Sequence, residues 1–316
     1  MRLYTKTAAI IILLNLSAGP LLAGELGADQ IAIEANILHR DSDKNTTYLY
    51  DNNGTVNNSV DDIPLADTGS FSDDADIGYR LSGSKQVSGK WSINAGIFSS
   101  DLSKTDNFSD PSSQLEIFRL PLTANFDAAD SVSAAYDSKL QNAEINAVYR
   151  YSNSLDLFAG VTQYKLDEQF KIISDDSAAA GIGTYTINTN NKLLGPQVGL
   201  AYSYKPGAKY SLYFIGKLAW LNNDASQNQY VDDAPTFTRS NSASGSHSSS
   251  LYDIKIGVNY YFTQQLALNL GYQYIKISDL ALAESQFDTT AAGSNTLNAS
   301  DSVSWGGFSL GLGYFF

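Results

Sequence analysis

Large apolar residues alternate with small or polar residues in ten separate stretches of this chain. In YDIKIGVNYYF, every second residue from Tyr252 to Phe262 is large and apolar, and aspartate, lysine, glycine and asparagine are among those between them. Because successive side chains of a β-strand point to opposite faces, this pattern predicts strands with one apolar face. No window after residue 23 shows sustained helical spacing of apolar residues, so we expect an all-β chain. The other stretches are IAIEANIL (31–38), IGYRLSG (77–83), WSINAGIF (91–98), AEINAVYRY (143–151), LDLFAGVT (155–162), QVGLAYSY (197–204), YSLYFIGKLAW (210–220), LALNLGYQY (266–274) and FSLGLGYFF (308–316).

The connectors between these stretches alternate in length. The short ones carry turn-forming residues, as in SKQVSGK, SNS, KPGAK and TQQ. The long ones are polar and cover roughly residues 40–73, 100–136, 167–190, 223–249 and 278–301. This asymmetry is typical of an up-and-down antiparallel barrel in an outer membrane, with short periplasmic turns and long extracellular loops.

We therefore predict a transmembrane β-barrel of ten strands over residues 24–316. A segment inside the loop 100–136, LEIFRLPL (115–122), leaves a twelve-stranded barrel as the alternative. Pro121 argues against that alternative, because proline cannot donate a hydrogen bond to a neighbouring strand.

The N-terminus has the three parts of a secretory signal. Basic residues precede the apolar run AAIIILLNLSAGPLLA, which ends in small residues. We predict a signal peptide over residues 1–23, cleaved after Ala23, with Ala18 as the second choice. A membrane anchor is the alternative, but the apolar core is short for a helix that spans a bilayer. Export would place the mature chain in the outer membrane of a Gram-negative bacterium.

Charge and cysteine content limit the partners. Loss of residues 1–23 leaves 18 of the 20 Lys and Arg residues against 33 Asp and Glu residues, a formal net charge of −15. This argues against nucleic acid, because phosphate binding needs clustered cations. The absence of cysteine excludes a lipoprotein and a disulfide framework. The expected partners are outer-membrane lipid and lipopolysaccharide, with the barrel-assembly machinery and periplasmic chaperones during biogenesis.

Aromatic residues gather next to the short turns and at the C-terminus, where they predict a girdle at the periplasmic interface. The last strand must close against the first in lipid, so its outward row stays apolar to the end. We assign Tyr314 and Phe316, on that row, to a C-terminal assembly signal. The girdle residues are Tyr149, Tyr151, Tyr202, Tyr204, Tyr210, Tyr260, Phe262, Tyr314 and Phe316.

The inward rows carry four acids and four bases. This balance predicts a cross-linked interior, because buried charges must be paired or hydrated. Side chains already fill a barrel of about eight strands, so a ten-stranded pore would be narrow. The loop 100–136 is long enough to plug it. The predicted lumen-lining charges are Glu34, Arg80, Glu144, Arg150, Asp156, Lys217, Asp253 and Lys255.

The sequence offers little that predicts catalysis or metal binding. His39 and His247 could each belong to a Ser/His/Asp triad. Serine and aspartate are so common in this chain, however, that their proximity carries little information, and we interpret both as solvated loop histidines. The clusters DSDKN (41–45) and SDDAD (72–76) resemble oxygen-ligand sets, yet the first lacks the Gly and Glu of a calcium loop. We predict no catalytic, cofactor or metal residues and no enzyme activity.

Several stretches resemble a family of bacterial outer-membrane β-barrel porins, the seventh of such families. The resemblance covers most of the chain after about residue 77 and implies fold and location, but no substrate and no catalytic residues. We therefore expect a narrow porin-like channel for small solutes, or alternatively a structural or surface-recognition barrel that acts through its loops. The stretches are DSKLQNAEINAVYRY (137–151), LFAGVTQYKLDEQFKI (157–172), YTINTNNKLLGPQVGL (185–200) and LALNLGYQYIKISDLALA (266–283).

Overall fold

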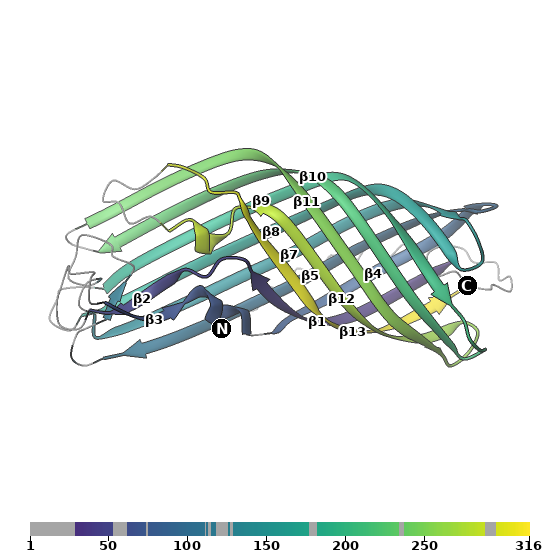
Figure 1. The fold of residues 1–316 in the computed structure, drawn as a ribbon, viewed down its shortest axis with the longest axis horizontal. Helices are drawn as coiled ribbons and strands as arrows, with labels where there is room; N and C mark the ends of the chain where they lie inside the picture. Colours follow the sequence, from purple (N-terminus) through teal and green to yellow (C-terminus); the bar gives the residue numbers. More distant parts are fainter. Residues whose placement is uncertain are drawn as a thin grey trace.

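Ten antiparallel strands close into a barrel in the computed structural model (Figure 1), as the alternating stretches predict. The structure describes residues 29–52, 62–73, 75–110, 112, 115–117, 126, 129–176, 182–233, 237–287 and 295–316, so the predicted signal peptide lies outside it. The order around the wall is β1-β13-β12-β11-β10-β9-β8-β7-β5-β4. The barrel strands are β1 (Gln30–Ser42), β4 (Ala75–Ser88), β5 (Trp91–Ser109), β7 (Ser131–Arg150), β8 (Leu155–Asp175), β9 (Ile182–Tyr204), β10 (Tyr210–Asp233), β11 (Phe237–Tyr261), β12 (Leu266–Leu280) and β13 (Asp301–Phe315).

A second, three-stranded sheet stands apart from the barrel wall. It has the order β3-β2-β6, with β2 at Thr47–Asp51, β3 at Ile63–Asp67 and β6 at Leu115–Ile117. The segment that suggested twelve strands therefore contributes β6 to this accessory sheet, and the barrel has ten strands. Two short 3₁₀ helices, η1 (Thr68–Asp73) and η2 (Ala283–Ser285), complete the described elements. No helix in the described part of the chain is long and apolar enough to cross a membrane.

The last strand closes the barrel against the first. β13 pairs with β1 from Gln30 opposite Phe315 to Ser42 opposite Val303, and β1 pairs with β4 on its other side. On the outward face of β13, Phe308 is 65% exposed and Leu310 54% exposed. The apolar row of the C-terminal stretch thus faces outward, and no backbone edge is left open to lipid.

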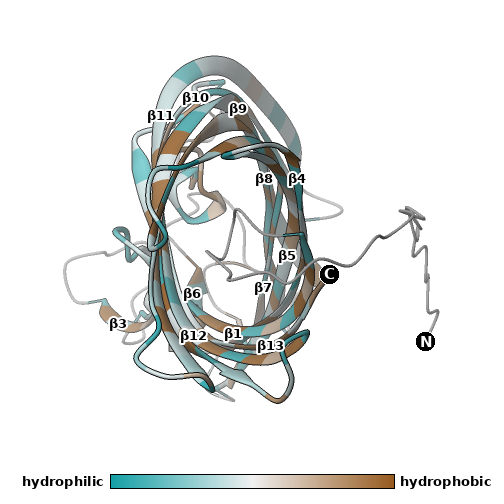
Figure 2. Cartoon of the chain, turned by 90° about the vertical axis from the view of Figure 1, so that its right-hand side faces the viewer, coloured by the Kyte–Doolittle hydropathy of each residue, from teal (hydrophilic) through white to brown (hydrophobic). Residues whose placement is uncertain are grey.

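Large apolar residues are exposed on the barrel strands. Hydrophobic and hydrophilic residues alternate along these strands (Figure 2). At the turn end, aromatic rings pack side by side on the outer face. The ring centroids of Tyr210 and Tyr260 are 5.2 Å apart, and those of Tyr314 and Phe316 are 5.0 Å apart. These contacts are consistent with an interfacial girdle.

Two of the expected long loops are strands instead. β8 continues to Asp175 and β9 begins at Ile182. Likewise, β10 continues to Asp233 and β11 begins at Phe237. The predicted loops 167–190 and 223–249 are therefore mostly wrong. Outside the membrane the outward face of a strand no longer needs an apolar row, so the pattern that marks the membrane-spanning part of the strand ends while backbone pairing continues. Figure 1 shows these long strands reaching beyond β1, β12 and β13 on the side of the accessory sheet.

Candidate functional site

The predicted lumen-lining charges project inward, and six of them form one connected network. Glu34 on β1 accepts hydrogen bonds from Lys255 Nζ on β11, with 2.6 Å to each carboxylate oxygen. Arg80 is the register partner of Glu34 on β4, and its Nε lies 3.9 Å from Glu34 Oε2. Because β12 and β13 separate β11 from β1 in the wall, the Glu34–Lys255 pair bridges strands that are not neighbours.

Lys217 forms the second half of the network. Its Nζ donates to both Glu144 oxygens at 2.9 and 3.0 Å and lies 3.3 Å from Asp253 Oδ2. Gln273 connects the halves, because its Oε1 accepts from Arg80 Nη2 at 3.1 Å and its Nε2 donates to Asp253 Oδ1 at 2.8 Å. Each buried charge in this group thus has an opposite charge or an amide within reach, which offsets its desolvation.

The other two predicted lumen charges lie apart from the network. Arg150 and Asp156 are register partners beside the β7–β8 turn, and Arg150 Nε is 3.6 Å from Asp156 Oδ1. They close the periplasmic end of one hairpin. Alternation predicts the face of a strand on which a residue lies, but it carries no information about depth along the strand.

Two small cavities lie in the turn-end half of the lumen. One of about 80 Å³ is lined by Arg80, Glu144 and Lys217, and one of about 90 Å³ by residues that include Asn259 and Phe315. Each has room for only a few water molecules.

An apolar layer fills the lumen directly beyond the charge network. Trp305 and Ile275 are fully buried in it, and nine of the ten barrel strands contribute side chains. Its members are at most 3% exposed, so apolar side chains pack closely across the lumen at this level. The layer consists of Leu38, Phe98, Leu140, Tyr164, Leu166, Leu193, Ala219, Leu221, Leu251, Ile275, Ile277, Leu280, Leu282, Val303 and Trp305.

A second ionic group, absent from our sequence-based set, lies on the extracellular side of this layer. Arg40 Nη2 is 2.9 Å from Glu168 Oε1 and 3.3 Å from Glu284 Oε1. The guanidinium also lies over the Tyr136 ring, 5.1 Å from its centroid. Glu168 and Glu284 lie in segments that we expected to be loops, so strand alternation did not identify them as inward residues. Arg40 could have been identified from the sequence, because strand alternation places it next after Leu38 on the inward row.

The connection after β12 folds into the barrel and supplies Glu284. We call residues 281–287 the inner segment. Asn191 on β9 holds its start by donating to Ala281 O at 2.8 Å and accepting from Ala281 N at 2.9 Å. The backbone N–H of Ala283 donates to Glu168 Oε2 at 3.0 Å. Asp279, just before the inner segment, has a φ of 58° and turns the chain inward.

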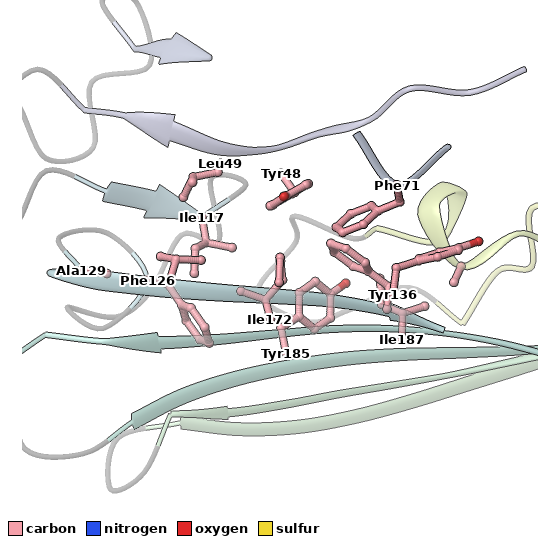
Figure 3. Close-up of a cluster of buried hydrophobic side chains, with 14 of the residues drawn as sticks. Tyr48, Leu49, Phe71, Ile117, Phe126, Ala129, Tyr136, Ile172, Tyr185 and Ile187 are labelled. Carbon is pink, nitrogen blue, oxygen red and sulfur yellow. The ribbon is translucent and has the colours of Figure 1, made fainter. Parts of the chain in front are cut away.

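A further apolar cluster caps the inside of the extended strands (Figure 3). Leu115, Ile117, Phe126 and Ala129, from the connection between β5 and β7, are buried in it. The expected plug loop 100–136 thus contributes to the cap. The inner segment, which our sequence analysis did not single out, fills the lumen beneath it.

The two histidines are not brought together. His39 is exposed on the outer face of β1, whereas His247 is partly buried on the inner face of β11, so the interpretation of both as loop histidines is wrong. Of the acidic clusters, Asp74 lies outside the described residues. Within the part of the chain that the structure describes, no group of three His, Cys, Asp or Glu side chains is placed to hold a metal ion.

Comparisons with known proteins agree with this architecture. The model of the family described as "Putative beta barrel porin-7" matches residues 28–302. The chain belongs to this family. It is an outer-membrane β-barrel of a porin family, as the resemblance of its strand motifs predicted. No curated protein matches it.

Solved outer-membrane barrels are similar to this family member at low identity. The outer membrane protease OmpT from Escherichia coli is 10% identical with a TM-score of 0.46, and the match covers 92% of this chain and 98% of OmpT. The toluene transporter TodX from P. putida is 12% identical with a TM-score of 0.39, and the match covers 93% of this chain and 91% of TodX.

Proposed function

We propose that this porin-family barrel is closed in its resting state and works as a structural or surface-recognition protein through its extracellular extension. The apolar layer around Trp305 carries the proposal. Ions and polar solutes lose their hydration in such a layer without gaining polar partners, so the barrier to passage is high. A filled interior leaves the outer surface as the working part.

The extension supports this proposal by its size. Strands β7 to β11 contain 20, 21, 23, 24 and 25 residues. A tilted strand crosses the apolar part of a bilayer with about 9–11 residues. Roughly half of each strand thus stands outside the membrane, where the apolar cap around Phe71 and Tyr136 packs against its inner face. An exposed, internally packed sheet of this size is suited to contact with other molecules.

Planar-bilayer recording of the refolded full chain tests the closed state. We expect no conductance steps above those of protein-free bilayers. Regular steps from the unmodified protein would overturn the proposal. Heat-modifiable mobility in gels verifies that the sample is folded.

A narrow, gated channel for small solutes is the second candidate, favoured by the polar charge network below the apolar layer. The inner segment would be its gate, because hydrogen bonds from Asn191 hold it to the wall. The chain has no cysteine, so Asn191→Cys with Ala281→Cys offers a clean lock. If conductance appears when this pair is reduced and vanishes when it is oxidised, the channel is supported. Silence in both states supports the closed barrel.

A further inference from the structure

A hollow of about 620 Å³ lies on the outside of the barrel, over β5, β7, β8, β9 and β10. One row of register partners crosses all five strands there: Asp101, Lys139, Asp167, Asn190 and Ser226. Residues that alternate with them, such as Leu102 and Glu168, also line the hollow but are buried, whereas the row itself is exposed or half-buried, so the hollow opens outward.

A second row lies two residues farther from the membrane along each strand. It consists of Ser103, Asp137, Gln169, Asn188 and Asn228, again in register across five strands. Gln169 Nε2 donates to Asn188 Oδ1 at 2.7 Å, and the two rows together present amide, carboxylate and hydroxyl groups to the hollow. Amides and carboxylates offer the donors and acceptors that sugar hydroxyls need.

Two lysines lie on the membrane side of the hollow. Lys165 on β8 and Lys192 on β9 are direct register partners on the outward face. Like charges in such a pair destabilise a sheet unless something compensates them. Asp167 lies 2.5 Å from Lys165, and Asp224 is the register partner of Lys192. The Lys165–Asp167 pair is partly exposed and such pairs contribute little, so both ammonium groups can still bind an added anion.

The apolar band begins next to Lys192 on β9 and, on β8, is separated from Lys165 by one outward residue. Its uppermost outward residues on β8, β9 and β10 are Val161, Leu194 and Trp220, which are 49%, 56% and 59% exposed. In the direction away from the membrane, Lys192 is the next outward residue after Leu194 on β9. Apolar surface, cationic groups and a polar hollow thus succeed one another along the same strands.

We propose that this face, which we call the lysine-hollow site, binds one phosphorylated glycolipid of the outer leaflet. The acyl chains would lie along the apolar band, a phosphate would lie between Lys165 and Lys192, and the sugars would enter the hollow. The order of the three surfaces matches the order of chemical groups in such a lipid. The carboxylates of Asp101 and Asp137 lie in the sugar rows, where they accept hydrogen bonds from hydroxyls.

Lipid binding by folded full-length protein in detergent tests this proposal. Native mass spectrometry would compare bisphosphorylated lipid A with the same lipid after dephosphorylation. We expect the variant Lys165→Gln with Lys192→Gln to lose at least tenfold in affinity for the bisphosphorylated form only. The matched control is Lys90→Gln with Lys209→Gln, exposed lysines at the periplasmic turns, which should leave affinity unchanged.

Two outcomes would overturn the site. One is an equal loss in the control, which would show a general charge effect. The other is the absence of any preference for the phosphorylated lipid. A third variant, Asn188→Leu, tests the hollow itself: it should weaken binding of a glycolipid that carries core sugars and leave lipid A binding unchanged. Unchanged binding of both lipids would show that the sugars do not bind in the hollow. Unchanged gel mobility in every variant verifies folding.

Discussion

The Nζ atom of Lys255 lies 2.6 Å from both carboxylate oxygens of Glu34, although β12 and β13 separate their strands in the barrel wall. We predict that Lys255→Met destabilises the folded barrel by about 3 kcal/mol, because it leaves a buried carboxylate without its main partner. Adding Glu34→Gln should recover much of that loss. Urea unfolding in lipid vesicles measures both changes, and an additive double variant would contradict the pairing.

The seam between the first and last strands gives a second prediction. A Cβ atom on Gly307 would lie 2.0 Å from the carbonyl oxygen of Ile37, whereas one on Gly313 would have its nearest neighbour at 3.6 Å. Gly307→Ala should therefore push β13 away from β1 and cost about 1–3 kcal/mol, as overpacking does. Gly313→Ala, on the same strand and face, is the control and should be tolerated. Unfolding midpoints distinguish the two, and equal midpoints would contradict the close approach.

How far the sequence predicts this molecule depends on which environment a residue meets. Within the membrane, lipid on one side forces alternation, so Tyr252, Ile254 and Ile256 could be assigned to the outside. Beyond the membrane that constraint ends. The sequence pattern of strand residues such as Gln227 and Asn228 predicted a loop, although they pair in register with Ala243 and Ser242.

The lumen shows the same division. Inward charges such as Glu144 and Lys217 followed from strand parity, but parity does not identify partners, which depend on barrel closure and shear. The inner segment was not predictable in this way. Its residues Ala281, Leu282 and Ala283 are fully buried without belonging to any strand, and Asn191, its main anchor, lies 90 positions earlier in the chain.

The anchor of the inner segment gives a third prediction. Asn191→Leu keeps the side-chain volume but removes both hydrogen bonds to the Ala281 backbone, which leaves buried polar groups unsatisfied. Such a loss costs about 1–3 kcal/mol. Backbone hydrogen exchange across residues 281–287 should accelerate accordingly, by roughly 5- to 150-fold. Asn188→Leu, on the outward face of the same strand, is the matched control and should leave that exchange rate unchanged.

The C-terminal assembly signal remains a prediction, and the structure suggests how to separate assembly from stability. Tyr314 is 44% exposed on the outer face, and its ring packs edge-to-face against Phe316. Phe316→Ser should reduce the amount of barrel inserted in cells, while protein refolded from urea should unfold at nearly the same midpoint as the unmodified chain. Phe315→Leu alters a side chain that faces the lumen and should insert normally. Equal insertion of both variants would contradict the signal.

Acidification should tighten the docking of the inner segment. Burial raises the pKa of Glu284 above its ordinary value, and the Glu168 carboxylate adds to the rise, while the Arg40 guanidinium opposes it. The docked state therefore holds this proton more strongly than a state in which the segment is released to water. The resulting stabilisation is complete below the ordinary pKa of about 4.5 and is lost as the pH rises through the docked-state pKa.

Hydrogen exchange of residues 281–287, corrected for intrinsic pH dependence, should slow as the pH falls through that window. Glu284→Gln should abolish the dependence, because an amide does not titrate. Exchange that accelerates on acidification, or a pH dependence that survives in Glu284→Gln, would exclude Glu284 as the group responsible.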